Sequence, residues 1–277
     1  MDAISAIGSN LASSETSRVL AEAFIKLQRT VGRLSSGKRI TSPDVDAAGM
    51  SQLEKLISQI DQINAGNSNV ANAASFTEVQ SGAARQLADI ENRKGELAVR
   101  AQDFTLTDSD RQAMQTEFAS LQGAQNQILG QKFNDIPVFS SSGQQVVADG
   151  EGANVNLSAI NLGAAVASGG IAESTSNATS ISTASNASGA LSTIKSSLNN
   201  LTRGLAQIGA GQSQLGVTAE TNGVRAENLA AAASRIGDAD IASESANLSR
   251  FNTSVQAGVF GVSRANAAAR FTLDVLA

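Results

Sequence analysis

The 277-residue sequence contains no cysteine, histidine, tryptophan or tyrosine, and only two prolines. Without cysteine the chain can form neither disulfides nor thiolate metal sites. Without histidine it lacks the most frequent general base of enzymes. Aromatic residues make up 3% of the chain, so the large side chains that usually fill a compact core are scarce. These absences argue against an enzyme or a metalloprotein and favour helices that pack through small aliphatic side chains.

Charge and hydropathy argue against two further classes of partner. The formal net charge of −5 provides no basic surface for nucleic acid. The sequence has no run of 18 apolar residues, so it contains no candidate membrane-spanning helix. The first twenty residues lack a basic region followed by an apolar one, and we therefore expect no cleaved signal peptide. If the protein is secreted, we expect a machine that does not read such a peptide.

The main positive feature of the sequence is a long helical periodicity of its apolar residues. Apolar residues recur at steps of three and four from about Asp44 to about Asp103, and most regularly from Leu191 to Ile236. About sixty helical residues would span roughly 90 Å. Because several heptads in a row need a partner along their length, we predict that these two helices pack together, with Gln212 and Asn222 helping to fix the register. The fold class expected is mainly α, a long antiparallel helical rod with coiled-coil packing.

Both ends of the chain carry apolar stripes. The N-terminal stripe consists of Leu20, Phe24, Leu27, Val31 and Leu34, and the C-terminal stripe of Leu248, Val255, Val259, Val262, Leu273 and Leu276. A lone pair of such helices has too little core to hold itself together. We therefore predict that the stripes bury their faces against further copies of the chain, and that both ends are mobile in the free subunit and become helical on assembly.

Polar segments separate these stripes from the long helices. Residues 35–46 contain Gly37 and Pro43, and residues 237–246 begin with Gly237. Proline disfavours α geometry in the residue before it and suits the first turn of a new helix. We predict two joints here, with Gly37, Pro43 and Gly237 as hinge residues.

A shorter helix follows the first long one. The stretch TLTDSDRQ (105–112) has turn and capping chemistry, and Asp108 and Asp110 are favourable in a first helical turn. Gly130 is the expected C′ residue, which closes helices in the left-handed conformation.

The period then changes to one typical of strands. IPVF (136–139), QQVVADGEGANVNLSAI (144–160) and their turn residues predict a few short strands or hairpins, with Pro137 on an edge strand. Residues 167–189 are rich in serine, alanine and threonine and are expected to be exposed and irregular.

Two motifs that could bind ligands have simpler interpretations. GAGQSQLG (209–216) lacks the third glycine of a phosphate-binding loop and interrupts no heptad. DGEG (149–152) lacks the alternating oxygen ligands of a calcium loop and is better explained as a hairpin turn. We therefore predict no catalytic, cofactor or metal site.

Four segments carry a recognisable family pattern. RLSSGKRITSPDVDAAG (33–49) resembles the RLSSG-x-RI-N-S-A-x-DDAAG signature of bacterial flagellins, and SRIGDADIASESANLSR (234–250) resembles their C-terminal SRI-x-DADYA segment. ELAVRAQD (96–103) and FND (133–135) are similar to the family's ELAVQ-type and FNG segments. Val45 and Gly237 stand where acidic residues are usual. The resemblance is to a short, alphaproteobacterial-like flagellin without large outer domains.

The resemblance implies an inner domain, D0, and a surrounding domain, D1. The expected D0 helices are residues 1–34 and 247–277, joined to D1 by spokes at 35–46 and 237–246. D1 would comprise helices in 47–131, β-hairpins and an exposed loop in 132–189, and the C-terminal rod helix in 190–236.

The resemblance also implies a function. The chain would be a structural subunit of the flagellar filament, self-assembling outside the cell into a helical tubular propeller for motility after type III flagellar export. The implied partners are other copies and sister flagellins, hook-associated and cap proteins, the export apparatus and a secretion chaperone. Two alternatives stay open: a hook–filament junction protein, and a type III translocator that inserts amphipathic helices in membranes.

Some flagellins are also bound by toll-like receptor 5. Arg93, Leu97 and Glu117 occupy matching positions, whereas Gly95 and Leu121 stand where basic residues are frequent in the family. Packing of the rod explains the same residues, and we expect recognition by the receptor to be weak.

Overall fold

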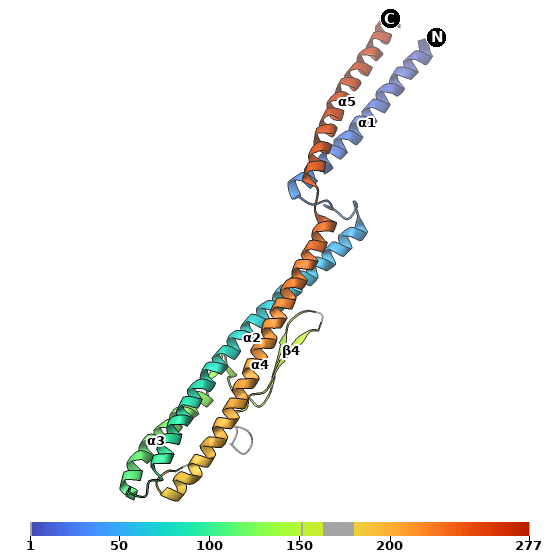
Figure 1. The fold of residues 1–277 in the computed structure, drawn as a ribbon. Helices are drawn as coiled ribbons and strands as arrows, with labels where there is room; N and C mark the ends of the chain where they lie inside the picture. Colours follow the sequence, from blue (N-terminus) through green and yellow to red (C-terminus); the bar gives the residue numbers. More distant parts are fainter. Residues whose placement is uncertain (1, 151, 163–179, 277) are drawn as a thin grey trace. The chain divides into compact units, whose positions relative to one another are not determined.

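The computed structural model describes residues 2–150, 152–162 and 180–276, with side chains for 14–150, 152–162 and 180–267. In these ranges the chain is mainly α, as predicted, with five helices and two small antiparallel sheets (Figure 1). It divides into a terminal unit, Met1–Ser58 with Asn228–Ala277, and a rod unit, Gln59–Glu227.

Two long helices make up most of the terminal unit. Helix α1 spans Asp2–Ser36 and helix α5 spans Ile241–Leu276. They lie side by side and antiparallel (Figure 1), since Arg33 pairs with Glu244 while Leu20 lies against Gly258. The start of α2 (Ala47–Arg100) and the end of α4 (Ala184–Gly237) complete the unit.

The rod unit is built on α2 and α4, which pack antiparallel as predicted. Three clusters of buried residues join them, and each adds a further element: helix α3 (Asp108–Leu129), the segment 138–162, or the second hairpin. The heptad prediction for α4 is confirmed at positions seven apart, which are all buried: Ile194, Leu201, Ile208, Leu215 and Asn222. The Asn222 amide, however, donates to the carbonyl of Ala148 at 2.8 Å, so it anchors a hairpin to α4 and does not fix the register of α2.

Capping chemistry starts α3 where the sequence predicts it. Thr107 and Asp110 form a reciprocal capping box, and Asp108 and Asp110 occupy the first turn. Gly130 follows the helix, but its φ of −84° is not left-handed. Its N–H donates to Asn126 O at 3.1 Å, so helical hydrogen bonding continues to Gly130, just before the next strand.

Two hairpins form the β region. Strands β1 (Lys132–Phe133) and β2 (Ile136–Pro137) flank a two-residue turn, and β3 (Gln144–Val147) pairs with β4 (Asn154–Leu157). Asn134 and Asp135 have φ values of 48° and 64°. Positive φ at both central residues is the signature of a type I′ turn, whose twist matches that of the strands.

Several predicted boundaries were wrong by a few residues. Helix α4 begins at Ala184 and not at 190, because Thr183 caps it, and α5 begins at Ile241 and not at 247, because Asp240 accepts from Ala242 N and Ser243 N. Most of the polar residues that suggested longer joints lie on solvated helical turns, whereas Glu244 is buried. Residues 163–179 of the expected loop lie outside the described ranges.

Pro43 was also expected in the first turn of a helix, and this was wrong. It occupies the second position of a turn closed by Val45 N donating to Ser42 O at 3.1 Å, which is the position that suits the fixed φ of proline. Helix α2 begins at Ala47, with Asp46 accepting from Gly49 N at 2.8 Å.

Candidate self-assembly surfaces

The N-terminal stripe is divided by the fold into an inner and an outer part. Leu20, Leu27 and Leu34 lie half-buried on the face of α1 that packs against α5. Phe24 and Val31, by contrast, are each 48% exposed. The stripe therefore holds the helix pair together with some of its residues and presents the rest to the outside.

The C-terminal stripe is divided in the same way. Leu248, Val255 and Val262 are half-buried, whereas Val259 is 52% exposed. The side chains of Leu273 and Leu276 lie outside the described range.

Further exposed apolar side chains on this unit were missed by the sequence analysis. The apolar residues of the terminal unit that remain about half or more exposed are Val19, Phe24, Ile25 and Val31 on α1 and Ile241, Val259 and Phe260 on α5. The stripe pattern follows one helix face only, so it could not find residues on other faces. Seven large exposed apolar side chains on one helix pair are the surface that further copies of the chain would cover. We call these seven residues the outer apolar set.

The predicted joints are paired with each other. Arg39 N donates to Gly237 O at 2.7 Å and Ala239 N donates to Gly37 O at 2.9 Å. Gly37 has a φ of 68°, a left-handed conformation that glycine adopts without strain. The structure thus brings the predicted hinge residues Gly37 and Gly237 together, while Pro43 belongs to a separate turn.

An ion pair that the sequence analysis did not predict lies next to the joints. Arg33 Nη1 and Glu244 Oε1 are 3.3 Å apart, and Glu244 is buried. Arg33 Nε and Glu244 Oε2 have no hydrogen-bond partner among the described residues. Since the two residues are far apart in sequence, only their positions in the two family-like motifs could have indicated a link.

The three residues considered for receptor contact do not share one environment. Arg93 lies 2.7 Å from Glu117 and 2.8 Å from Glu96, and the hydrogen bond to Glu117 is the main cause that raises the pKa of the Arg93 guanidinium. Leu97 is only 2% exposed and packs in the cluster with Phe118 and Ile194. Arg93 and Glu117 are therefore available at the surface, whereas Leu97 belongs to the core.

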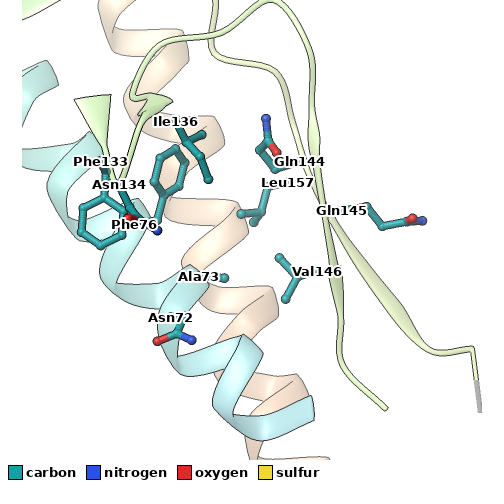
Figure 2. Close-up of a pocket in the computed structure, with 10 residues that line it drawn as sticks. All are labelled: Asn72, Ala73, Phe76, Phe133, Asn134, Ile136, Gln144, Gln145, Val146 and Leu157. Atoms are coloured by element: carbon teal, nitrogen blue, oxygen red, sulfur yellow. The ribbon is translucent and has the colours of Figure 1, made fainter. Parts of the chain in front are cut away.

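The rod unit also contains an apolar pocket that the sequence did not indicate. It has a volume of about 450 Å³. Figure 2 shows Phe76 of α2 beside Phe133 and Ile136 of the first hairpin, with Leu157 of the second hairpin opposite. The rings of Phe76 and Phe133 meet edge to face, with centroids 5.9 Å apart.

Metal-binding clusters and membrane-spanning helices are two features that other function classes would require. No group of three acidic, histidine or cysteine side chains is arranged to hold a metal ion in this part of the chain. None of the helices, as far as they are described, combines the length and hydropathy needed to cross a membrane.

Comparison with known proteins identifies the family. Residues 7–144 match the bacterial flagellin N-terminal helical region, and residues 191–276 match the bacterial flagellin C-terminal helical region. Flagellin FlaB1 of Treponema pallidum is 29% identical over 98% of this chain and 99% of its own length. The flagellar filament 30.7 kDa core protein of Treponema maltophilum is 29% identical over the same shares of the two chains, 98% and 99%.

A solved structure has a similar fold. It is described as a flagellar hook-associated protein from Vibrio parahaemolyticus, with a TM-score of 0.59, 15% sequence identity, and coverage of 70% of this chain and 100% of that one. At this identity the likeness concerns the fold alone. The two family matches, which cover both ends of the chain and most of its helices, decide the assignment: the chain belongs to the bacterial flagellins.

Proposed function

We propose that the chain polymerises into the flagellar filament through the α1–α5 pair, with the outer apolar set as its main contact surface. The chain is a structural subunit of that filament, as its family and its filament core protein relatives indicate. The observation that supports this route of assembly is the exposure of seven large apolar side chains on a two-helix pair.

The physical argument rests on unburied apolar area. Two antiparallel helices bury only one face of each other, so Phe24, Val259 and Phe260 remain in water. Covering a fully exposed side chain of this kind contributes about 1.5–3 kcal/mol, so the half-exposed Phe24 and Val259 would each contribute roughly half of that. If the covering surface lies at a different place on the next copy, the contact is heterologous and generates an open helical polymer.

We assign the α1–α5 pair to the inner domain of the filament, and helices α2, α3 and α4 with the hairpins to the surrounding domain. The joints at residues 37–46 and 237–240, which lie within the terminal unit, then act as the spokes between the two layers. Their turn-forming and hydrogen-bonded backbone suits a short crossing that must hold its geometry.

Export and further partners belong to the same proposal. The chain leaves the cell unfolded through the type III flagellar apparatus, and a secretion chaperone covers the C-terminal stripe before export. Hook-associated and cap proteins then meet the assembled subunits at the ends of the filament. Recognition by toll-like receptor 5 remains weak, since Arg93 and Glu117 are exposed but Leu97 is buried in the rod.

Single substitutions in the outer apolar set test the proposal. Phe260→Ser removes a side chain that is 73% exposed, so the monomer should keep its helix content by circular dichroism. The critical concentration for polymerisation, measured by sedimentation and electron microscopy, should rise at least about tenfold. Val79→Ser, which removes an exposed apolar side chain from the rod unit, is the matched control and should change it less. Equal effects of the two variants would contradict the role given to the terminal unit.

Experiments on the same purified protein also distinguish the filament subunit from the two alternative functions. A hook–filament junction protein would cap short assemblies without elongating them, whereas a filament subunit forms long polymers on its own. A membrane-inserting translocator would bind lipid vesicles as a monomer, which the proposal does not expect.

A further inference from the structure

Phe104 is the most exposed large apolar side chain among the described residues, at 93%. It lies in the turn 101–107 that joins α2 to α3 in the rod unit. An aromatic ring left in water gives up the favourable burial that its large apolar area offers. An isolated exposed valine needs no explanation, but a fully exposed phenylalanine at the tip of a turn suggests a contact with another molecule.

The turn that carries Phe104 is held in one conformation. The Asp103 carboxylate accepts from Thr105 N at 2.9 Å and from Thr105 Oγ1 at 2.8 Å. Behind the turn, Arg111 donates to Ala101 O and to Asp103 O, each at 2.7 Å. Phe104 is therefore presented on a fixed support, and binding would cost little ordering entropy.

The apolar pocket of the rod unit has the matching chemistry. Phe76, Phe133, Ile136 and Leu157 supply apolar walls, and a volume of about 450 Å³ leaves ample room for one phenyl ring. Figure 2 shows the amide of Gln144 at one side of this opening, while Gln145, its neighbour on the same strand, points away. A ring entering here would meet the two aromatic rings that already pack edge to face.

Phe104 cannot enter the pocket of its own chain. The pocket lies beside Phe76, and α2 continues from there to Arg100 as one helix. At 1.5 Å per residue this part of the helix spans about 36 Å. Only the Phe104 of another copy can therefore occupy the pocket.

We propose that the pocket between α2 and the two hairpins is a socket for Phe104 of a second copy of the chain. The proposal rests on the filament function above and adds a specific contact between rod units. Because Phe104 and the socket lie at different places along one rod, the same contact can repeat from copy to copy, which is the heterologous arrangement that a filament needs.

The size of the contact fits a polymer and not a stable dimer. One phenylalanine buries about 150–250 Å², whereas stable pairs bury about 1,200–2,000 Å². The socket is therefore expected to be filled only where other contacts already hold the copies together, as in a filament.

Disulfide crosslinking tests the proposal directly, because the chain has no cysteine of its own. Thr105→Cys combined with Gln144→Cys places one thiol beside Phe104 and one at the socket. Oxidised filaments of this variant should give a ladder of covalent oligomers on a denaturing gel. The matched control, Thr105→Cys with Val147→Cys, should give at least about tenfold less, because Val147 is 50% exposed on the same strand and does not line the pocket.

The outcomes separate this inference from the filament function. Filaments that give no ladder, or equal ladders for the two variants, overturn the socket alone, and so does a crosslink formed within single monomers. Failure of the unmodified chain to form filaments overturns both proposals. As a second measurement, Phe104→Ala should raise the critical concentration by about tenfold and Phe104→Leu by less, since leucine keeps part of the apolar volume. An unchanged critical concentration for Phe104→Ala overturns the socket.

Discussion

At the scale of single residues, the backbone of the first hairpin turn is strained at Asp135, and substitution there tests this. Asp135 sits at a φ of 64°, where any residue other than glycine pays a steric cost. Asp135→Gly should therefore stabilise the rod unit by about 0.5–1 kcal/mol in urea unfolding, after allowance for the greater freedom of glycine in the unfolded chain. Asp135→Val should destabilise it, because β-branched residues tolerate this conformation least. A destabilising glycine would contradict the turn geometry described.

The capping box of α3 predicts a dependence on pH. Asp110 accepts from Thr107 Oγ1 at 2.7 Å and from Thr107 N at 3.0 Å, and these bonds hold the pKa of its carboxyl below the ordinary 3.8. A depressed folded-state pKa means that the stabilisation is complete above the unfolded pKa and is lost as the pH falls through the folded one.

The test compares wild type with Asp110→Asn. The wild type should lose more unfolding free energy between about pH 5 and about pH 3 than the variant, whose amide does not titrate. Other carboxylates contribute equally to both proteins, including Asp103, whose pKa is lowered in the same direction by its hydrogen bonds to Thr105. Parallel pH profiles would show that the carboxylate does not support the cap.

At this scale, the sequence could predict features that depend on neighbouring residues, but not contacts between residues far apart in the chain. The acidic first turn of α3 was predicted from neighbours within a few residues. Gly37 was predicted as a hinge residue, although its left-handed conformation was not. The ion pair of Arg33 with Glu244 was not, because its partners are 211 residues apart. Gly66 was equally hidden: it lies inside α2 because a Cβ there would collide with the carbonyl of Ala148.

At the scale of elements, helices with a single partner face were predicted best. The heptads of α4 were predicted correctly because four of the five positions seven apart, Ile194, Leu201, Ile208 and Leu215, pack in clusters that contain α2 residues. Burial within the terminal stripes was harder to predict. Helices α1 and α5 each pack one face against the other helix, and each also has apolar residues outside that face. Phe24 and Val31 were assigned to the stripe by their spacing. The spacing did not show that they are exposed while the leucines of the stripe are half-buried.

The contact of α2 with α3 contains a buried ion pair. Lys94 and Glu91 are both fully buried, with Lys94 Nζ 3.4 Å from Glu91 Oε1 and 2.8 Å from Gln125 Oε1 of α3. The ring of Phe118 lies 5.3 Å below the same ammonium. Lys94→Ala would leave the Glu91 carboxylate buried without its cation and should cost about 3–5 kcal/mol in urea unfolding.

Lys195→Ala is the control for this prediction. Lys195 is exposed on α4, and its loss should change the unfolding free energy by no more than about 0.5 kcal/mol. A similar small change for Lys94→Ala would mean that water or another group already satisfies Glu91.

At the scale of the whole molecule, the two ends depend on each other for helical structure. Truncation after Arg250 removes most of α5 and exposes the inner face of α1. The truncated chain should keep a cooperatively unfolding rod unit and fail to form sedimentable filaments. Filament formation by this variant would contradict the assembly role of the C-terminal stripe.

Amide exchange extends the same argument to the free subunit. Helices that bury only one face open at low free energy, so α1 and α5 should exchange faster than α2 and α4 in the monomer. Protection of the ends should rise on polymerisation. Equal protection of the ends in both states would show that assembly is not what orders them.

The hydrogen bonds between the two joints have a mechanical consequence. Arg39 N to Gly237 O and Ala239 N to Gly37 O tie the outgoing and returning chain into one double-stranded strap. A pull or twist on the helix pair is then shared by two covalent backbones, and neither can rotate without carrying the other. In a rotating filament such a strap transmits torque with less slack than two independent tethers of the same length.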